Sequence, residues 1–206
     1  MGPTYWLRHF ARRAPRGELC GTLTGMPTYV ALLRGINVGN AKQVSMADLA
    51  AVVDTCGGTD VRTVLRSGNV VFTAKEPVAG AAVEAELLRR TGVSSSVLLI
   101  GGAALLRVAA DNPLLDVADD PSRLMVGFTS QPPDGSLAPD AATLAPEMLV
   151  VGEHAVYQWC PDGVMASRVP ASFWRQVAPV VTVRNWRTVL RLVELVAPPG
   201  RSGVTR

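Results

Sequence analysis

The sequence predicts an α+β protein, a tandem duplication of two ferredoxin-like (βαββαβ) subdomains with a linking helix and a C-terminal helix. Three observations predict this fold. The order βαββαβ occurs twice along the chain, short apolar strands alternate with amphipathic helical segments, and turn residues separate the strands of each hairpin. The repeat is one of topology and not of residue identity.

The first strand and helix have clear boundaries. Tyr29–Leu33 is an unbroken apolar run with the length of a strand that is buried on both faces. A helix is expected to open at Ser45, because Asp48 three residues later completes a capping box. Gly57–Gly58 is expected to close it.

A hairpin, a helix and a fourth strand complete the first unit. Val61–Leu65 and Val70–Thr73 are predicted to pair across Ser67–Gly68–Asn69, since Gly-Asn is a favoured tight-turn pair. Val78–Arg90 is typical of a helix, and Val97–Ile100 is a further apolar strand.

The same order of elements follows a linking helix. That helix, Ala103–Ala110, is stopped by Asn112–Pro113. Arg123–Thr129 is expected to be a strand and Asp140–Leu144 a short helix.

A second hairpin, a helix and a last strand end the second unit. Met148–Val151 and Ala155–Trp159 are predicted to pair over Gly152–Glu153–His154. Pro170–Val177 is predicted to be helical, with proline at a permitted first-turn position, and Val180–Val183 is the last strand.

A final helix is predicted from Asn185, with Val189, Leu192, Val193 and Val196 on one face. The predicted division of the chain is a leader (1–26), a first subdomain (27–101), the linking helix with the second subdomain and the C-terminal helix (102–197), and a disordered tail (198–206).

The formal charge of +3 is confined to the first 25 residues, where Arg8, Arg12, Arg13 and Arg16 stand against Glu18 alone. The other residues carry 16 basic and 16 acidic side chains, so the folded body is electroneutral. The leader lacks the apolar core of a secretory signal. We expect the leader either to be disordered or to result from a translation start assigned too far upstream, in which case Met26 is the natural initiator.

Composition and motifs exclude several classes of protein. No run approaches the roughly 18 apolar residues of a membrane span. Cys20, Cys56 and Cys160 are odd in number and lack metal-type spacing, which favours a cytoplasmic location. No phosphate loop, dinucleotide fingerprint or metal-type histidine spacing occurs, so no cofactor or metal is expected.

The histidines offer no catalytic arrangement. His9 lies in the leader and His154 is expected to be exposed at a hairpin tip, so no Ser-His-Asp or Cys-His set is available. No catalytic residue is assigned, and the sequence leaves open whether the protein is an enzyme.

Three segments together resemble the bacterial family known as domain of unknown function 1697: YVALLRGINVGN (29–40), DVRTVLRSGNVVFTA (60–74) and VTVRNWRTVLRLVEL (181–195). The resemblance spans about residues 27–197 and implies tandem ferredoxin-like subdomains, with no established activity. The loop after Pro161 departs from the family pattern, because Ala166 stands where members usually have a basic residue and Arg168 keeps the second one.

Candidate ligand-binding residues lie where two loops should meet. In a βαββαβ unit the turn after strand one and the hairpin between strands two and three share one end of the sheet. Arginines, amides and glycine-freed backbone N–H groups there suit a phosphate or carboxylate. The candidates are Arg34, Gly35, Asn37, Gly39, Asn40, Lys42, Arg66, Ser67 and Asn69.

A second cluster is expected at one end of the second unit. There the loop Asp162–Arg168 should approach the start of the final helix, whose N-terminus adds positive potential. Its candidates are Ser167, Arg168, Arg184, Asn185 and Trp186.

Each candidate also has a purely structural interpretation. The glycines would shape a crossover turn in which Asn37 bonds to the backbone, and Arg34 would fasten the two halves together. Residues 67–69 would be an ordinary hairpin turn, Asn185 a helix N-cap, and Trp186 a side chain packed on the sheet.

Three functions therefore stay open from sequence. The first is binding of a small anionic or nucleotide-like ligand at the Arg34–Asn40/Arg66–Asn69 end. The alternative is a non-enzymatic protein-interaction module whose covered sheet faces pack two subdomains or two subunits of a homo-oligomer. A nucleic-acid-binding module is less favoured, because the body is neutral and Phe72 is the one aromatic residue in its strand.

Overall fold

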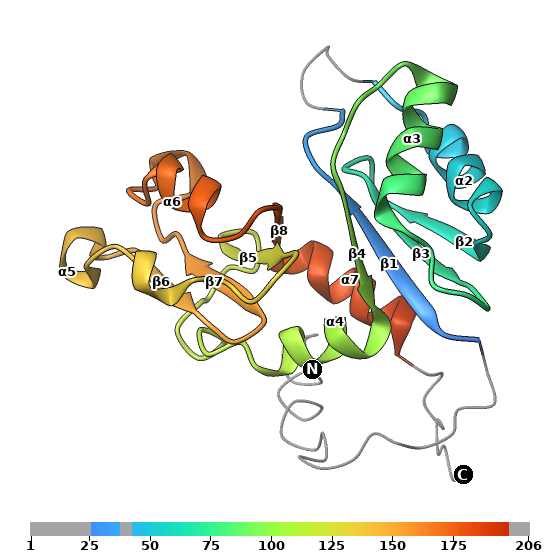
Figure 1. The fold of residues 1–206 in the computed structure, drawn as a ribbon. Helices are drawn as coiled ribbons and strands as arrows, with labels where there is room; N and C mark the ends of the chain where they lie inside the picture. Colours follow the sequence, from blue (N-terminus) through green and yellow to red (C-terminus); the bar gives the residue numbers. More distant parts are fainter. Residues whose placement is uncertain (1–25, 38–42, 198–206) are drawn as a thin grey trace, which may run out of the picture.

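The computed structural model describes residues 26–37 and 43–197. These residues contain two four-stranded antiparallel sheets and six α-helices. We call residues 26–101 the first half and residues 102–197 the second half. The first half contains β1 (Thr28–Leu33), α2 (Met46–Thr55), β2 (Thr59–Val64), β3 (Asn69–Thr73), α3 (Gly80–Thr91) and β4 (Val97–Gly101) (Figure 1).

The second half begins with a helix and ends with one. Its elements are α4 (Gly102–Ala110), β5 (Leu124–Thr129), η1 (Gly135–Leu137), α5 (Ala141–Leu144), β6 (Met148–Val151), β7 (Ala155–Trp159), η2 (Val164–Ala166), α6 (Ala171–Gln176), β8 (Val181–Asn185) and α7 (Trp186–Val196). The predicted leader and tail, and the candidates Gly39, Asn40 and Lys42, lie outside the described residues.

The two sheets have the same strand order relative to their order in the chain. The first is β2-β3-β1-β4 and the second is β6-β7-β5-β8, and every neighbouring pair is antiparallel. Because β1 lies between β3 and β4, the end of β1 has the β2–β3 turn on one side and the start of β4 on the other.

One predicted boundary is wrong in a way that matters for the site. Asn69 is not a turn residue but the first residue of β3, where it pairs with Leu32 and Val64. The turn is formed by residues 65–68, and it closes through positive φ angles at Leu65 and Gly68. The pattern Gly-Asn located the turn correctly but placed it one residue too late.

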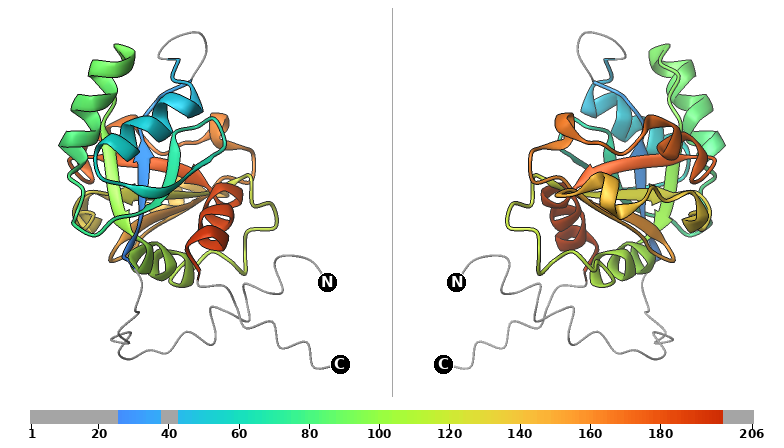
Figure 2. Two further views of the ribbon diagram at one scale, coloured as in Figure 1. Left: turned by 90° about the vertical axis from the view of Figure 1, so that its right-hand side faces the viewer. Right: turned by 90° about the vertical axis from the view of Figure 1, so that its left-hand side faces the viewer.

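Alternation along β1 divides the core into layers. Ala31 and Leu33 point to one face, where they pack with α2 and α3. Val30 and Leu32 point to the other, into a central core that also holds Phe128 of β5. Figure 1 shows α4 and α7 between the two sheets, and the left view of Figure 2 shows α2 and α3 in front of the first sheet with the second half behind it.

A third, smaller core lies on the outer face of the second sheet. Phe173 of α6 packs there with Val156 of β7 and Val181 of β8. Helices α5 and α6 are shorter than α2 and α3, so this face has the thinner cover. The described part of the chain contains no helix long and apolar enough to span a bilayer.

Candidate functional site

Three segments meet at the end of β1. Leu33 N–H donates to Gly68 O at 2.8 Å, and Arg34 N–H donates to Ser96 O at 2.9 Å. The Ser95 hydroxyl donates to Arg34 O, also at 2.9 Å. The chain after β1 is therefore held on one side by the β2–β3 turn and on the other by the loop before β4, and Arg34 lies beside the Arg66–Gly68 turn.

Gly68 is required by this arrangement. Its φ is +74°, and a Cβ atom built on it would lie 2.9 Å from the Ile36 side chain and from Leu33 Cβ. Gly35 has a similar φ of +64°, but a Cβ there would meet nothing within 4 Å. The first glycine permits close packing, whereas the second serves only the direction of the chain.

Asn37 has the structural role that was the alternative from sequence. Its Nδ2 donates to Val44 O at 3.0 Å and to Arg66 O at 2.8 Å, and its Oδ1 accepts from Val44 N–H at 2.8 Å. The Asn37 side chain therefore connects the chain before residue 38 to the chain after residue 43, and it connects both to the β2–β3 turn. Its polar atoms are thus occupied within the protein.

Asn69 is closed to ligands. It is fully buried, and its Nδ2 donates to Val64 O and to the Ser67 hydroxyl, both at 2.9 Å. Its Oδ1 accepts a hydrogen bond from Arg184 Nε. The turn residue Ser67 is exposed, but its hydroxyl oxygen is engaged by Asn69.

Arg184 fastens the second half to this end of the first. It is buried, with 8% exposure, and its NH2 group donates to Leu33 O at 2.6 Å and to Ser67 O at 3.3 Å. Within its own strand it donates to the Thr182 hydroxyl at 2.7 Å. The fastening role considered for Arg34 therefore belongs to Arg184, through carbonyl and amide oxygens.

No carboxylate among the described residues lies within ion-pair distance of Arg184. Burial lowers the pKa of its guanidinium to about 10, so the group stays charged at neutral pH. A positive charge is thus buried directly behind the Arg34 and Arg66 loops.

The surface of this end is an open hollow of about 380 Å³, lined by Arg34, Gly35, Ser94, Ser95 and Ser96. Arg34 and Arg66 are exposed, and in the part of the chain that the structure describes neither guanidinium has an acidic partner. Ser94 and Ser96 are exposed beside Arg34. A guanidinium with adjacent hydroxyls offers several convergent hydrogen-bond donors to an anion.

Sequence reasoning missed the three serines, although a signal was present. The run Ser94–Ser96 directly precedes a predicted strand. In the observed sheet β4 runs antiparallel to β1, with Leu33 opposite Val97, so the residues before β4 lie beside those after β1. The predicted topology therefore already implied that the serines lie near Arg34.

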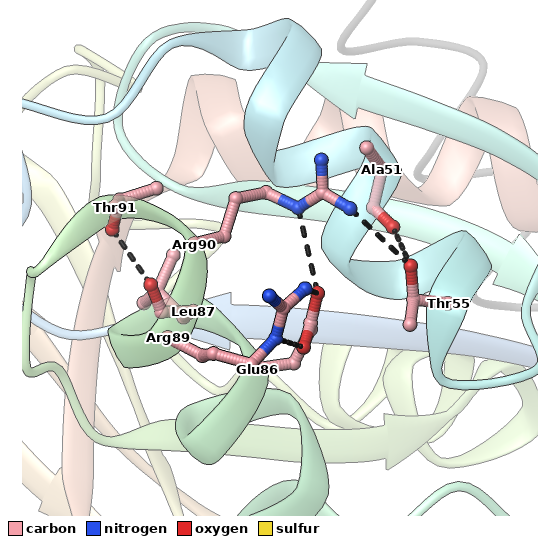
Figure 3. A network of polar contacts seen from close by, with 7 residues as sticks. All are labelled: Ala51, Thr55, Glu86, Leu87, Arg89, Arg90 and Thr91. Carbon is pink, nitrogen blue, oxygen red and sulfur yellow. Dashed lines mark hydrogen bonds and ion pairs between the residues drawn. The ribbon is translucent and has the colours of Figure 1, made fainter.

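A polar network holds the last turn of α3, from which the serine loop departs (Figure 3). Glu86 accepts hydrogen bonds from Arg89 at 2.6 and 2.7 Å and lies 3.5 Å from Arg90 Nε. The Arg89 hydrogen bond is the main cause that lowers the pKa of the Glu86 carboxyl. Arg90 also reaches Thr55 of α2 at 3.5 Å, so the network links the two helices over the first sheet.

The members of the second predicted cluster have separate partners. Glu147 is buried, and it accepts hydrogen bonds from the Ser167 hydroxyl and from Arg168 N–H, both at 2.7 Å, and from Gln158 Nε2. Arg168 also donates from its side chain to Ala145 O at 2.5 Å. The negative charge that this loop binds is thus the carboxylate of Glu147 from the same chain. Arg184 is not part of this cluster, because it bonds to the first half.

Glu147 is held in its charged form. Burial raises the pKa of its carboxyl, but the hydrogen bonds from Arg168 N–H, Ser167 and Gln158 outweigh burial and leave this pKa below its ordinary value. Burial also raises the pKa of the neighbouring Cys160 thiol to about 12, with a further contribution from Glu147. Cys160 therefore stays protonated and unreactive at neutral pH.

Asn185 and Trp186 have the structural roles considered for them. The Asn185 side chain caps α7 by accepting from Thr188 N–H at 3.0 Å, and Trp186 is buried in the central core. Ala166, which stands at the position that is usually basic in the resembling family, is exposed in η2. His154 is exposed at the hairpin tip, 3.6 Å from Glu153.

Residues 26–157 match the family model described as "Protein of unknown function (DUF1697)". Among solved structures, the conserved bacterial protein SP0830 from Streptococcus pneumoniae is similar, with a TM-score of 0.60 and 23% sequence identity over 84% of this chain and 100% of that one. That likeness establishes a shared fold. No curated protein matches the chain.

Proposed function

The chain belongs to the DUF1697 family of proteins of unknown function, and from this premise we propose that it binds a small anionic ligand at the end of β1. The observation that carries the proposal is the hollow in which the Arg34 guanidinium, which has no acidic partner among the described residues, adjoins the exposed Ser94 and Ser96. Hydroxyls and a guanidinium together favour the oxygen atoms of a phosphate or carboxylate group.

Electrostatics beyond the hollow support the same ligand class. Arg66 lies on the neighbouring turn, and the buried charge of Arg184 lies behind both loops. A buried cation acts through a medium of lower dielectric than water, so it attracts an anion at the surface more strongly than an exposed one does. A ligand with two negative charges, such as a phosphate monoester, fits this potential better than a single carboxylate.

The fold interpretation rests on the strand orders. The element order and the antiparallel orders β2-β3-β1-β4 and β6-β7-β5-β8 support a tandem arrangement, with a first ferredoxin-like subdomain in 27–101 and, in 102–197, a linking helix, a second such subdomain and a C-terminal helix. In this interpretation the hollow lies at the end of the first subdomain that the second one buttresses through Arg184.

The competing functions have less support. The apolar sheet faces that suggested an interaction module pack against α4 and α7 within the chain. Phe72, the aromatic residue of the strand likened to RNA-recognition folds, is fully buried and stacks on Tyr29 at 5.7 Å. It has no exposed face for a nucleic-acid base.

The test is thermal unfolding of the full chain with inorganic phosphate, a nucleoside monophosphate and citrate. At a hundred times its Kd, a ligand stabilises the folded protein by about 2.7 kcal/mol, which raises the Tm by several degrees. We expect a saturable rise with at least one phosphate compound, its loss in Arg34→Ala, and its retention in Arg175→Ala, a matched change of an exposed arginine on α6. An unmoved Tm with all three probes, or an equal rise in Arg34→Ala, contradicts the proposal.

A further inference from the structure

A second hollow, of about 230 Å³, lies in the second half beside the end of β4, away from the end of β1. One wall comes from the end of β4 and from α4, where Ala104, Arg107 and Val108 follow the i, i+3, i+4 spacing of a single helix face. The other wall comes from the end of β5 and the β6–β7 hairpin tip. The first half contributes Ile100 of β4 to the lining, and the second half contributes the other residues.

The two walls carry opposite charges. Arg107 lies on α4, and among residues 26–37 and 43–197 no carboxylate lies within ion-pair distance of its guanidinium. Glu153 lies on the hairpin, where its exposed carboxylate is 3.6 Å from His154. One wall of the hollow therefore favours an anionic group and the other a cationic group.

Between the charged residues the lining has an apolar part, and Thr129, Ser130 and Gln131 add polar groups beside it. Val108 and Phe128 belong to the central core, and Ile100 packs against that core while lining the hollow. An apolar surface flanked by a few polar groups that fix orientation is the usual form of a small-molecule site. The volume is below the roughly 300–1,000 Å³ of sites for drug-sized ligands, so it suits a molecule of the size of one amino acid.

We propose that this hollow binds a free α-amino acid with an apolar side chain. Its carboxylate would accept paired hydrogen bonds from Arg107, its ammonium group would lie against Glu153, and its side chain would pack on the half-buried Ile100, with Val108 and Phe128 beneath. A phosphate compound is disfavoured by Glu153 and an amine by Arg107, so the zwitterion is the class that both walls accept. The ligand differs from that of the Arg34 hollow.

The experiment is an amide ¹H–¹⁵N NMR titration of the full chain with L-leucine. We expect saturable shifts centred on Arg107, Phe128 and Glu153. Two further probes each lack one charge, 4-methylpentanoate without the ammonium and 3-methylbutylamine without the carboxylate. Each should bind at least about tenfold more weakly, the change that corresponds to about 1.4 kcal/mol.

Variants separate the two charged contacts. Arg107→Gln and Glu153→Gln should each lower the affinity for leucine by about tenfold, whereas Arg175→Gln, at a residue that lines neither hollow, should leave it unchanged. Arg34→Ala should also leave it unchanged, which distinguishes this site from the first. The proposal is overturned if leucine gives no saturable shifts at these residues, if either one-charge probe binds as tightly, or if Arg107→Gln has no effect.

Discussion

Arg184 and Asn69 are separated by 115 positions in the chain, and the hydrogen bond from Arg184 Nε to Asn69 Oδ1 joins the last strand of the second sheet to the first residue of β3. Both side chains are buried. The bond thus connects the two halves at the end of the molecule where the anion site is proposed.

Loss of this bond should destabilise the protein. Asn69→Ala removes the acceptor of the buried Arg184 Nε–H, and an unsatisfied buried group costs about 1–3 kcal/mol. We expect urea unfolding to show a free energy of unfolding lowered by at least that amount. The variant Arg184→Lys should also be less stable than the intact protein. One ammonium group cannot reach the oxygens of Asn69, Leu33 and Thr182 together. Equal stability of Asn69→Ala and the intact protein would show that the bond contributes nothing.

Two glycines of the site form a matched pair. Gly35→Ala and Gly68→Ala both place a side chain at a positive φ, which costs roughly 1–2 kcal/mol. Only at Gly68 would the new Cβ overlap Leu33 Cβ and Ile36, and overpacking adds typically 1–3 kcal/mol. Chemical denaturation should therefore rank Gly68→Ala well below Gly35→Ala in stability. Similar losses in the two variants would mean that the turn shifts to relieve the overlap.

Glu147 should make stability depend on pH in the acidic range. The pKa of its carboxyl is lowered in the folded protein relative to the ordinary value of 4.5. Its contribution to stability is therefore complete above that value and is lost as the pH falls through the folded pKa. Glu147→Gln should be less stable than the intact protein at neutral pH and should show a smaller loss on acidification. Unfolding curves at a series of pH values measure this, with the exposed Glu76→Gln as a control that keeps the intact dependence.

Cys160 should resist alkylation in the folded protein. Burial raises the pKa of its thiol to about 12, so at about pH 8 almost none of it is thiolate. Mass spectrometry after brief iodoacetamide treatment should find Cys160 unmodified in buffer and modified in urea. Rapid modification in buffer would show that the region around Glu147 opens.

The sequence predicted the elements well because their signals are local. Apolar runs located β1 and β4, and Asn185 was correctly considered as the N-cap of α7. The meeting of the Arg34 loop with the Arg66 turn followed from topology alone, and the structure places these two loops side by side. Whether they form a ligand site stays a prediction.

The partners of individual side chains were not predictable in the same way. The contact of Arg184 with Asn69 depends on how the second sheet is placed against the first, which no local pattern encodes. Glu147 gave no signal because its burial depends on the loop that folds over it from residues 167 and 168. The position of the serines before β4, by contrast, follows from the predicted topology, because β4 runs antiparallel to β1 and begins beside its end.

The central core makes each half of the chain depend on the other for folding. Val30 and Leu32 of β1 share that core with Val126 and Phe128 of β5 and with Leu192 of α7. A fragment that ends at residue 101 would leave one face of its sheet in water, without α4 and α7 to cover it. We therefore expect unfolding as one cooperative transition and insolubility of the isolated first half. The two halves would then be retained together in evolution, because loss of either one would expose the apolar sheet face of the other.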